Sequence, residues 1–190
     1  MVEEKIVDSN QYLSFKLGEE IFALEISSVR EVLEFTRVTK VPNTPEFMRG
    51  VINLRGGVVP VVDMKLKFGM GKTEATIDTC IIIVEIIIDD ELTILGAMAD
   101  SVREVMQLQQ DEIEPPPRIG TRLDVDFIKG MGKKDDEFII ILDINNVFSI
   151  QELSAVSGSQ SAKPISVTLE ERKEMNSKIN NTREVENHES

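Results

Sequence analysis

Short runs of alternating apolar and polar residues fill most of the chain between residues 12 and 150. The first two runs, 12–17 and 21–26, are separated by Gly18 and two glutamates, which favour a turn. Alternation with a period of two is the pattern of a strand with one buried face. The spacing therefore predicts a β-hairpin at the start of the chain.

One later run differs because it is apolar at almost every position. Residues 80–88 read CIIIVEIII, and residues 92–97 follow after an acidic turn formed by Asp89, Asp90 and Glu91. β-Branched residues on both faces are typical of a strand that is buried on both sides. We expect such a strand at the boundary between two packed modules.

The same passage occurs twice. Residues 21–33 return as 94–106 at an offset of 73, and residues 47–50 return as 127–130 at an offset of 80. Two separate blocks that keep their register indicate an internal repeat, and here they predict two similar modules related by a pseudo-twofold axis. The two interleaved modules are approximately residues 12–68 and 80–148.

Turn residues divide each copy into short elements. The glycines Gly56 and Gly57 suit a tight hairpin turn with positive φ, which leaves Arg55 exposed at its rim. The corresponding segment of the second copy, 132–136, predicts a longer polar turn. About five short strands per copy with little helix are typical of a small closed barrel. The predicted fold is therefore all-β, with two similar five-stranded barrels packed together.

Two kinds of local signal predict short helical turns. Asp63 and Asp143 each precede a short apolar segment, 64–68 and 144–148, and can cap a single helical turn there. Ser27 and Ser28 precede a run rich in valine, for which we predict a short turn that leads into a strand.

The composition changes after residue 153. Residues 154–163 are rich in serine, glycine and glutamine, and the rest of the chain is charged with few large apolar groups. Such a segment buries too little apolar surface to offset its ordering entropy. We therefore predict a flexible tail over residues 154–190, with at most a weak helix over residues 169–179.

Charge and size limit the possible partners. The chain has 190 residues and a net charge of −13, with 21 Lys and Arg against 34 Asp and Glu. An acidic protein without a dense basic run is a poor ligand for nucleic acid or for an anionic membrane. A module of about 60 residues is marginally stable alone, so the two modules should pack on each other.

The residues that usually carry catalysis are missing from the predicted modules. The only histidine is His188 in the predicted tail, and residues 69–73 end like a phosphate loop but lack its first glycine. No catalytic, cofactor-binding or metal-binding residue is predicted. Cys80 is expected to be a small buried hydrophobe, which fits a reducing cytoplasm, and neither a signal peptide nor a membrane span is expected.

A receiver-like signalling protein is the alternative function. Paired acidic residues after a strand, such as Asp89 and Asp90, hold magnesium for aspartyl phosphorylation in receiver domains. That fold also needs amphipathic helices of about ten residues or more between its strands, and the pattern predicts none. A hairpin turn is therefore the favoured interpretation of Asp89 and Asp90.

Residues 43–56, NTPEFMRGVINLRG, followed by VPVVD at 59–63, closely resemble the signature of the CheW family of bacterial chemotaxis coupling proteins. The similarity covers residues 11–153. It implies two five-stranded SH3-like barrels and a stand-alone adaptor without enzymatic activity. The implied partners are a CheA-type histidine kinase and the cytoplasmic tips of methyl-accepting chemotaxis receptors. The implied location is the cytoplasm, at receptor arrays that are reached through these partners.

The resemblance also implies where the receptor binds. The expected receptor face carries Ile26, Val29, Glu31 and Arg55, of which Arg55 lies inside the matching motif. Glu31 and Arg55 could instead pair with each other, and Ile26 and Val29 could belong to the barrel core. Residues 97–100 depart from the family pattern, which suggests a different receptor preference at the groove. The kinase interface is expected on barrel ends, without assigned residues.

Overall fold

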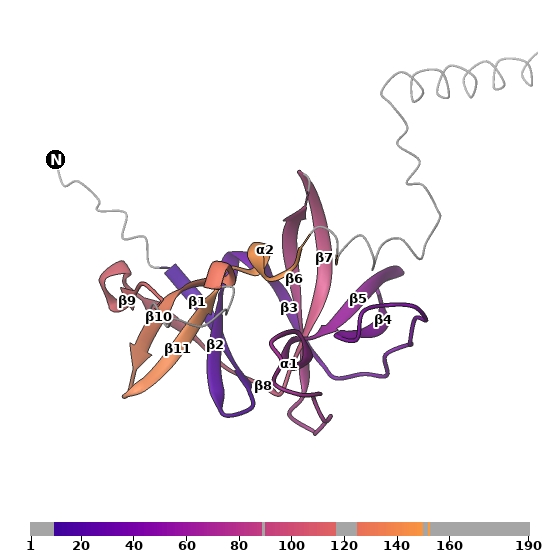
Figure 1. The fold of residues 1–190 in the computed structure, drawn as a ribbon, viewed down its shortest axis with the longest axis horizontal. Helices are drawn as coiled ribbons and strands as arrows, with labels where there is room; N and C mark the ends of the chain where they lie inside the picture. Colours follow the sequence, from indigo (N-terminus) through magenta and orange to yellow (C-terminus); the bar gives the residue numbers. More distant parts are fainter. Residues whose placement is uncertain (1–9, 89, 117–124, 150–151, 153–190) are drawn as a thin grey trace, which may run out of the picture. The chain divides into compact units, whose positions relative to one another are not determined.

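Most of the described residues lie in strands (Figure 1). The computed structural model describes residues 10–88, 90–116, 125–149 and 152, within one compact unit that spans Met1–Ser157. The tail and the weak helix predicted after residue 153 lie outside the described residues. The strands are β1 (Asn10–Leu17), β2 (Glu20–Glu25), β3 (Val29–Glu34), β4 (Met48–Leu54), β5 (Gly57–Asp63), β6 (Cys80–Ile88), β7 (Glu91–Ala99), β8 (Ser101–Leu108), β9 (Ile113–Glu114), β10 (Ile128–Lys134) and β11 (Glu137–Leu142).

Helical segments are short. Among the described residues, the α-helices are α1 (Met64–Lys67) and α2 (Ile144–Val147), and 3₁₀ turns cover Ile26–Ser28, Gln110–Glu112 and Val125–Phe127. Asp63 and Asp143 cap α1 and α2, as predicted, by accepting hydrogen bonds from backbone N–H groups of the first turn. The predicted turn before β3 is confirmed as the first of the 3₁₀ turns.

The strands form two sheets, which confirms the all-β fold of two SH3-like barrels. One sheet has the strand order β3-β6-β7-β5-β4, and the other has the order β8-β1-β2-β11-β10-β9. Neighbouring strands are antiparallel except for β5 with β7 and β2 with β11, which are parallel. The sixth strand of the second sheet, β9, has only two residues.

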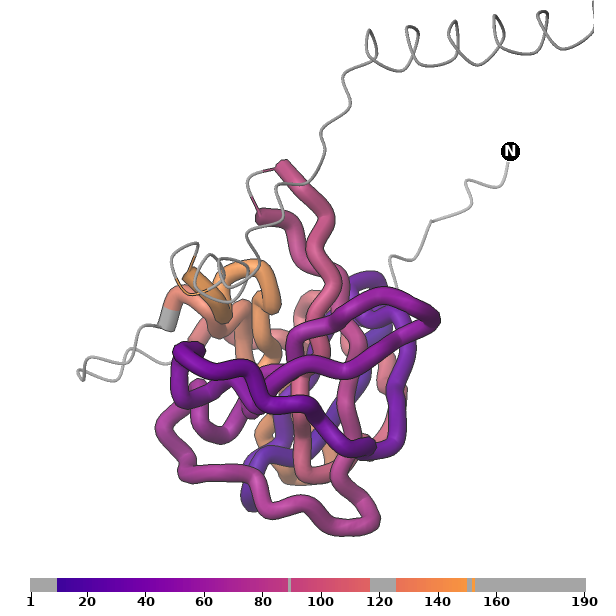
Figure 2. The backbone as a smooth tube through the Cα atoms, turned by 90° about the vertical axis from the view of Figure 1, so that its right-hand side faces the viewer, coloured from indigo at the N-terminus to yellow at the C-terminus, as the bar shows by residue number. Residues whose placement is uncertain are grey.

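Each sheet contains strands from both copies of the repeat. The first hairpin, β1–β2, pairs with β8 and β11 of the second copy. The hairpin β6–β7, which opens the second copy, pairs with β3 and β5 of the first copy. Figure 2 shows this hairpin extending beyond the neighbouring strands. Each barrel is therefore built from the opening hairpin of one copy and the later strands of the other.

Three apolar clusters follow from this arrangement. The largest joins both sheets and includes Phe15 and Leu24 from one and Ile82 and Val84 from the other. The two smaller clusters each draw on residues of one sheet, one with Tyr12 and Ile141 and the other with Ile81 and Ile83. Alternate residues of β6 thus enter different clusters, so the prediction of a strand buried on both faces is confirmed.

Aromatic contacts repeat across the pseudo-twofold axis. The ring of Phe68 in the first copy stacks on Phe127 of the second, with 5.0 Å between centroids. In the reciprocal pair the ring of Phe148 lies 6.2 Å from Phe47. Each copy therefore supplies one ring to each contact, and these aromatic contacts help to hold the two copies together.

Both hairpin turns are tight, as predicted for the first copy but not for the second. In the first copy positive φ falls on Arg55 (49°) and Gly56 (84°), whereas Gly57 begins β5. In the second copy the turn is the two-residue pair Asp135 and Asp136, both with positive φ, and residues 132–134 belong to β10. Both turns have left-handed central residues, the geometry that matches the twist of the flanking strands. The predicted longer turn at 132–136 is therefore wrong.

Candidate protein-interaction site

The predicted residues Glu31 and Arg55 form a two-pronged ion pair. The Nη1 and Nη2 atoms of Arg55 donate to the two carboxylate oxygens of Glu31 at 2.6 and 2.9 Å. The Arg55 side chain remains 74% exposed, whereas that of Glu31 is 24% exposed. The hydrogen bond to Glu31 raises the pKa of Arg55. The carboxylate thus orients a guanidinium that still presents most of its surface to solvent.

This ion pair spans the seam of its barrel. Strands β3 and β4 are the two edges of the five-stranded sheet, and Glu31 lies on β3 while Arg55 follows β4. A corresponding ion pair occurs in the other sheet, where Lys134 at the end of β10 donates to Glu104 of β8 at 3.0 Å. The pair therefore has a structural role in addition to any contact with a partner.

Ile26 and Val29 lie in a different environment. Both are partly buried and pack against the apolar cluster shared by the two sheets. A register shift between Val29 and Glu31 interrupts the regular alternation of β3 at this point. The four predicted residues therefore divide into two at the barrel seam and two that border the core between the sheets.

A groove lies beside the ion pair. It has a volume of about 530 Å³ and includes the exposed apolar side chains of Val58 and Leu92, which are 59% and 63% exposed. Arg30 also lines it and forms an ion pair with Glu85, with 3.0 Å between Nε and Oε1. The lining residues are Arg30, Leu54, Arg55, Gly57, Val58, Val59, Leu92, Thr93 and Ile94. Below, we call this the arginine groove.

Sequence reasoning missed most of this groove. Arg30 carried a usable signal, because it recurs as Arg103 in the repeated motif. No sequence signal marked Val58 and Leu92, since their exposure depends on how β5 and β7 pack. Residues 97–100 do not line this groove, and Ala97, Met98 and Ala99 are fully buried. The expectation that they change receptor preference stays a prediction.

The structure also bears on the alternative function. Asp90 lies in the turn between β6 and β7, and Asp89 is outside the described residues. The α-helices in the described part of the chain have four residues each, far shorter than a receiver fold needs. None of the described helices is long and apolar enough to cross a membrane.

A pair of interleaved β-barrels whose exposed site combines guanidinium and apolar groups defines a protein-binding module. The CheW-like domain model matches residues 11–152, so the chain belongs to this family of chemotaxis scaffold proteins.

Named relatives agree with this assignment. The chain is 30% identical over 146 residues to the chemotaxis protein CheW of Klebsiella aerogenes, which covers 77% of this chain and 86% of that protein. It is 32% identical over 138 residues to the CheW of Helicobacter pylori, covering 72% and 80% respectively. The crystal structure of the scaffolding protein TtCheW from Thermoanaerobacter tengcongensis matches with a TM-score of 0.67 at 40% identity, covering 76% of this chain and 90% of that one.

Proposed function

We propose that this protein couples methyl-accepting chemoreceptors to a CheA-type histidine kinase and catalyses no reaction itself. In this proposal residues 11–153 form the coupling domain, and binding to receptors brings the protein from the cytoplasm to membrane-associated arrays. The support comes from the family assignment and from the arginine groove, which offers an oriented cation beside exposed apolar side chains. Receptor tips would bind here, and the kinase elsewhere on the barrels.

Arg55 is the residue that we expect to contribute most to receptor binding. Its guanidinium is already held by Glu31, so little further side-chain entropy is lost when a partner docks. The groove beside it accepts apolar side chains at Val58 and Leu92. Ile26 and Val29 would act mainly by shaping the turn before β3 and the start of that strand, because they pack on the core.

Replacing Arg55 by glutamate tests the proposal. Charge reversal removes a contact and adds repulsion, which we expect to weaken receptor binding by about 2 kcal/mol, or roughly thirtyfold. Receptor-dependent stimulation of the kinase should fall accordingly when measured with receptor-containing membranes. The free energy of unfolding should change little, because the ion pair is exposed.

Two variants separate a partner contact from a structural role. The double variant Glu31→Arg with Arg55→Glu restores an ion pair in the opposite sense, so its stability should match the wild type while coupling stays low. Lys134→Glu breaks the counterpart pair with the same change in net charge, and it should keep its coupling. Full coupling by the double variant would mean that the pair serves the fold alone.

A further inference from the structure

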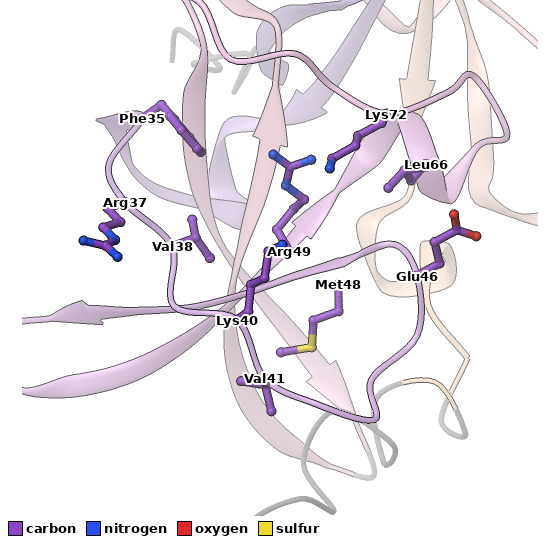
Figure 3. A pocket seen from close by; sticks show the side chains of 10 residues that line it. All are labelled: Phe35, Arg37, Val38, Lys40, Val41, Glu46, Met48, Arg49, Leu66 and Lys72. Carbon is purple, nitrogen blue, oxygen red and sulfur yellow. The ribbon is translucent and has the colours of Figure 1, made fainter.

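A second hollow lies away from the arginine groove and shares no lining residue with it. It has a volume of about 450 Å³ and is bordered by the connection between β3 and β4 and by the segment around α1 (Figure 3). Its lining residues are Phe35, Arg37, Val38, Lys40, Val41, Glu46, Met48, Arg49, Leu66 and Lys72. We refer to it as the basic pocket.

The charge of the basic pocket is opposite to that of the chain. Four of its lining residues are cationic and one, Glu46, is acidic, although the whole chain carries a net charge of −13. Among the described residues, Arg37, Lys40 and Lys72 form no ion pair. Like charges gathered in one hollow repel each other, and a bound anion would relieve that repulsion.

Arg49 is held in place at the wall of this pocket. Its Nη1 atom lies 3.5 Å from Oδ2 of Asp63 and the same distance from the carbonyl oxygen of Thr73. The Asp63 carboxylate is fully buried and already accepts shorter hydrogen bonds from the backbone N–H and hydroxyl of Thr73. Arg49 is thus oriented but weakly engaged. In Figure 3 its guanidinium and the side chain of Lys72 point into the same space.

The pocket also has an apolar floor. Phe35 and Val38 pack against the apolar cluster inside the five-stranded barrel. Met48, which also lines the pocket, is buried. A site for a small inorganic anion needs no such floor. A peptide with carboxylates around one apolar side chain matches both parts of the surface, because protein interfaces combine a desolvated apolar contact with a charged rim.

We propose that the basic pocket is a second docking site, which binds an acidic protein segment by inserting one apolar side chain among the cations. The proposal does not depend on receptor coupling through the arginine groove. Lys40 and Lys72 supply charge at the rim, and Arg49 supplies a preorganised guanidinium. Because electrostatic attraction contributes to this binding, it should weaken as salt is raised.

The test uses the full chain and a labelled peptide. The probe is a fluorescein-tagged peptide with two glutamates on each side of one leucine, and binding is followed by fluorescence anisotropy at low salt. The double variant Lys40→Glu with Lys72→Glu should bind at least tenfold more weakly than the wild type. The control Arg103→Glu with Lys133→Glu makes the same change in net charge elsewhere and should bind the peptide within about twofold of the wild type.

Further probes decide the nature of the ligand. A peptide with serine in place of leucine should bind several-fold more weakly, and one with glutamine in place of glutamate should not bind. Arg55→Glu should bind the peptide normally, which keeps this result distinct from receptor coupling. Equal binding by the double variant and its control would overturn the proposal. So would tighter binding of inorganic phosphate or of a DNA oligonucleotide than of the peptide.

Discussion

Arg55 adopts the backbone conformation of a tight turn and also presents an exposed charged side chain. Its φ of 49° lies in the left-handed region, which the turn between β4 and β5 requires and which few residues other than glycine adopt. The counterpart turn uses Asp135 and Asp136, which tolerate that region more easily. Placing an arginine there costs backbone strain, and it aims a charged side chain outward from the barrel seam.

Burial suppresses the reactivity of the Cys80 thiol. It is 6% exposed at the start of β6 and forms no disulfide. Burial raises the pKa of its thiol to about 11, from an ordinary value of 9.0. The thiol is therefore neutral at physiological pH and closed to solvent, as expected for a small buried hydrophobe.

We predict that Cys80 reacts with a thiol reagent only when the protein unfolds. At pH 8 native protein should be modified far more slowly than protein in concentrated urea. A folded-state pKa above the unfolded value stabilises the fold below pH 9, and this contribution is lost as the pH rises toward 11. Between those values the wild type should therefore lose more stability than Cys80→Ala. Rapid modification of the native protein would show that β6 opens readily.

At the scale of elements, α1 and α2 have the same design but different surroundings. Both follow an aspartate whose side chain caps the first turn. In each case the backbone N–H of that aspartate donates to the carbonyl oxygen of a phenylalanine at 2.8 Å. Asp63 is fully buried and also holds Thr73 and Arg49. Asp143 is half-buried and accepts from Asn145 and Asn146 instead. The first cap therefore anchors the segment between the two copies.

This difference predicts unequal costs for the same substitution. Asp63→Ala leaves the partly buried Arg49 and several hydrogen-bond donors without their acceptor, so it should lower the free energy of unfolding by about 3 kcal/mol. Asp143→Ala removes mainly a helix cap and should cost about 1 kcal/mol. Urea denaturation of both variants measures the difference. Equal losses would mean that Asp63 acts as a cap alone and that its contacts with Thr73 and Arg49 contribute nothing.

At the scale of the whole molecule, the interleaved copies make the two barrels interdependent. Each barrel loses its opening hairpin if the other copy is removed. The apolar cluster between the sheets also draws on strands from both copies. Neither half of the chain can therefore form a complete core alone.

We predict that residues 1–75 do not fold as a monomer and that the intact chain unfolds in a single transition. Dilute 1–75 should show poorly dispersed amide signals, and mixing it with residues 76–190 should restore dispersed signals. The fragment 76–190 measured alone is the control. A folded monomer of residues 1–75 would contradict the interdependence of the barrels.

Local patterns predicted the strands, the repeat and the helix caps because each depends on residues close in sequence. The exchange of hairpins was not predictable, since both pairings bury the same apolar faces. The need for glycine at Gly50 and Gly130 likewise depends on contacts with residues that are distant in sequence. Gly50 has φ of 139°, and a Cβ there would lie 2.0 Å from the Thr39 carbonyl oxygen. Gly130 lacks positive φ but leaves no room beside Ile113 of β9.

The candidate site divides in the same way. The pairing of Glu31 with Arg55 was one of the two roles expected for these residues, and the structure contains that pair. Their contact with a receptor stays a prediction. The rest of the arginine groove depends on how β3, β5 and β7 are arranged in the five-stranded sheet, which no local pattern encodes. The basic pocket was also missed, because its cations are spread over residues 37–72 and form no dense run.

The reciprocal pairing of hairpins has the connectivity of a domain-swapped homodimer whose two subunits are joined end to end. In such a dimer each subunit donates its opening hairpin to the other, and the swap is stable only while both subunits are present. The segment from Phe68 to Thr79 joins them here, which raises the effective concentration of each half for the other and removes any dependence on protein concentration. A single-copy protein of this design would assemble only above a threshold concentration. The fused chain holds the arginine groove and the basic pocket in a fixed arrangement at any expression level.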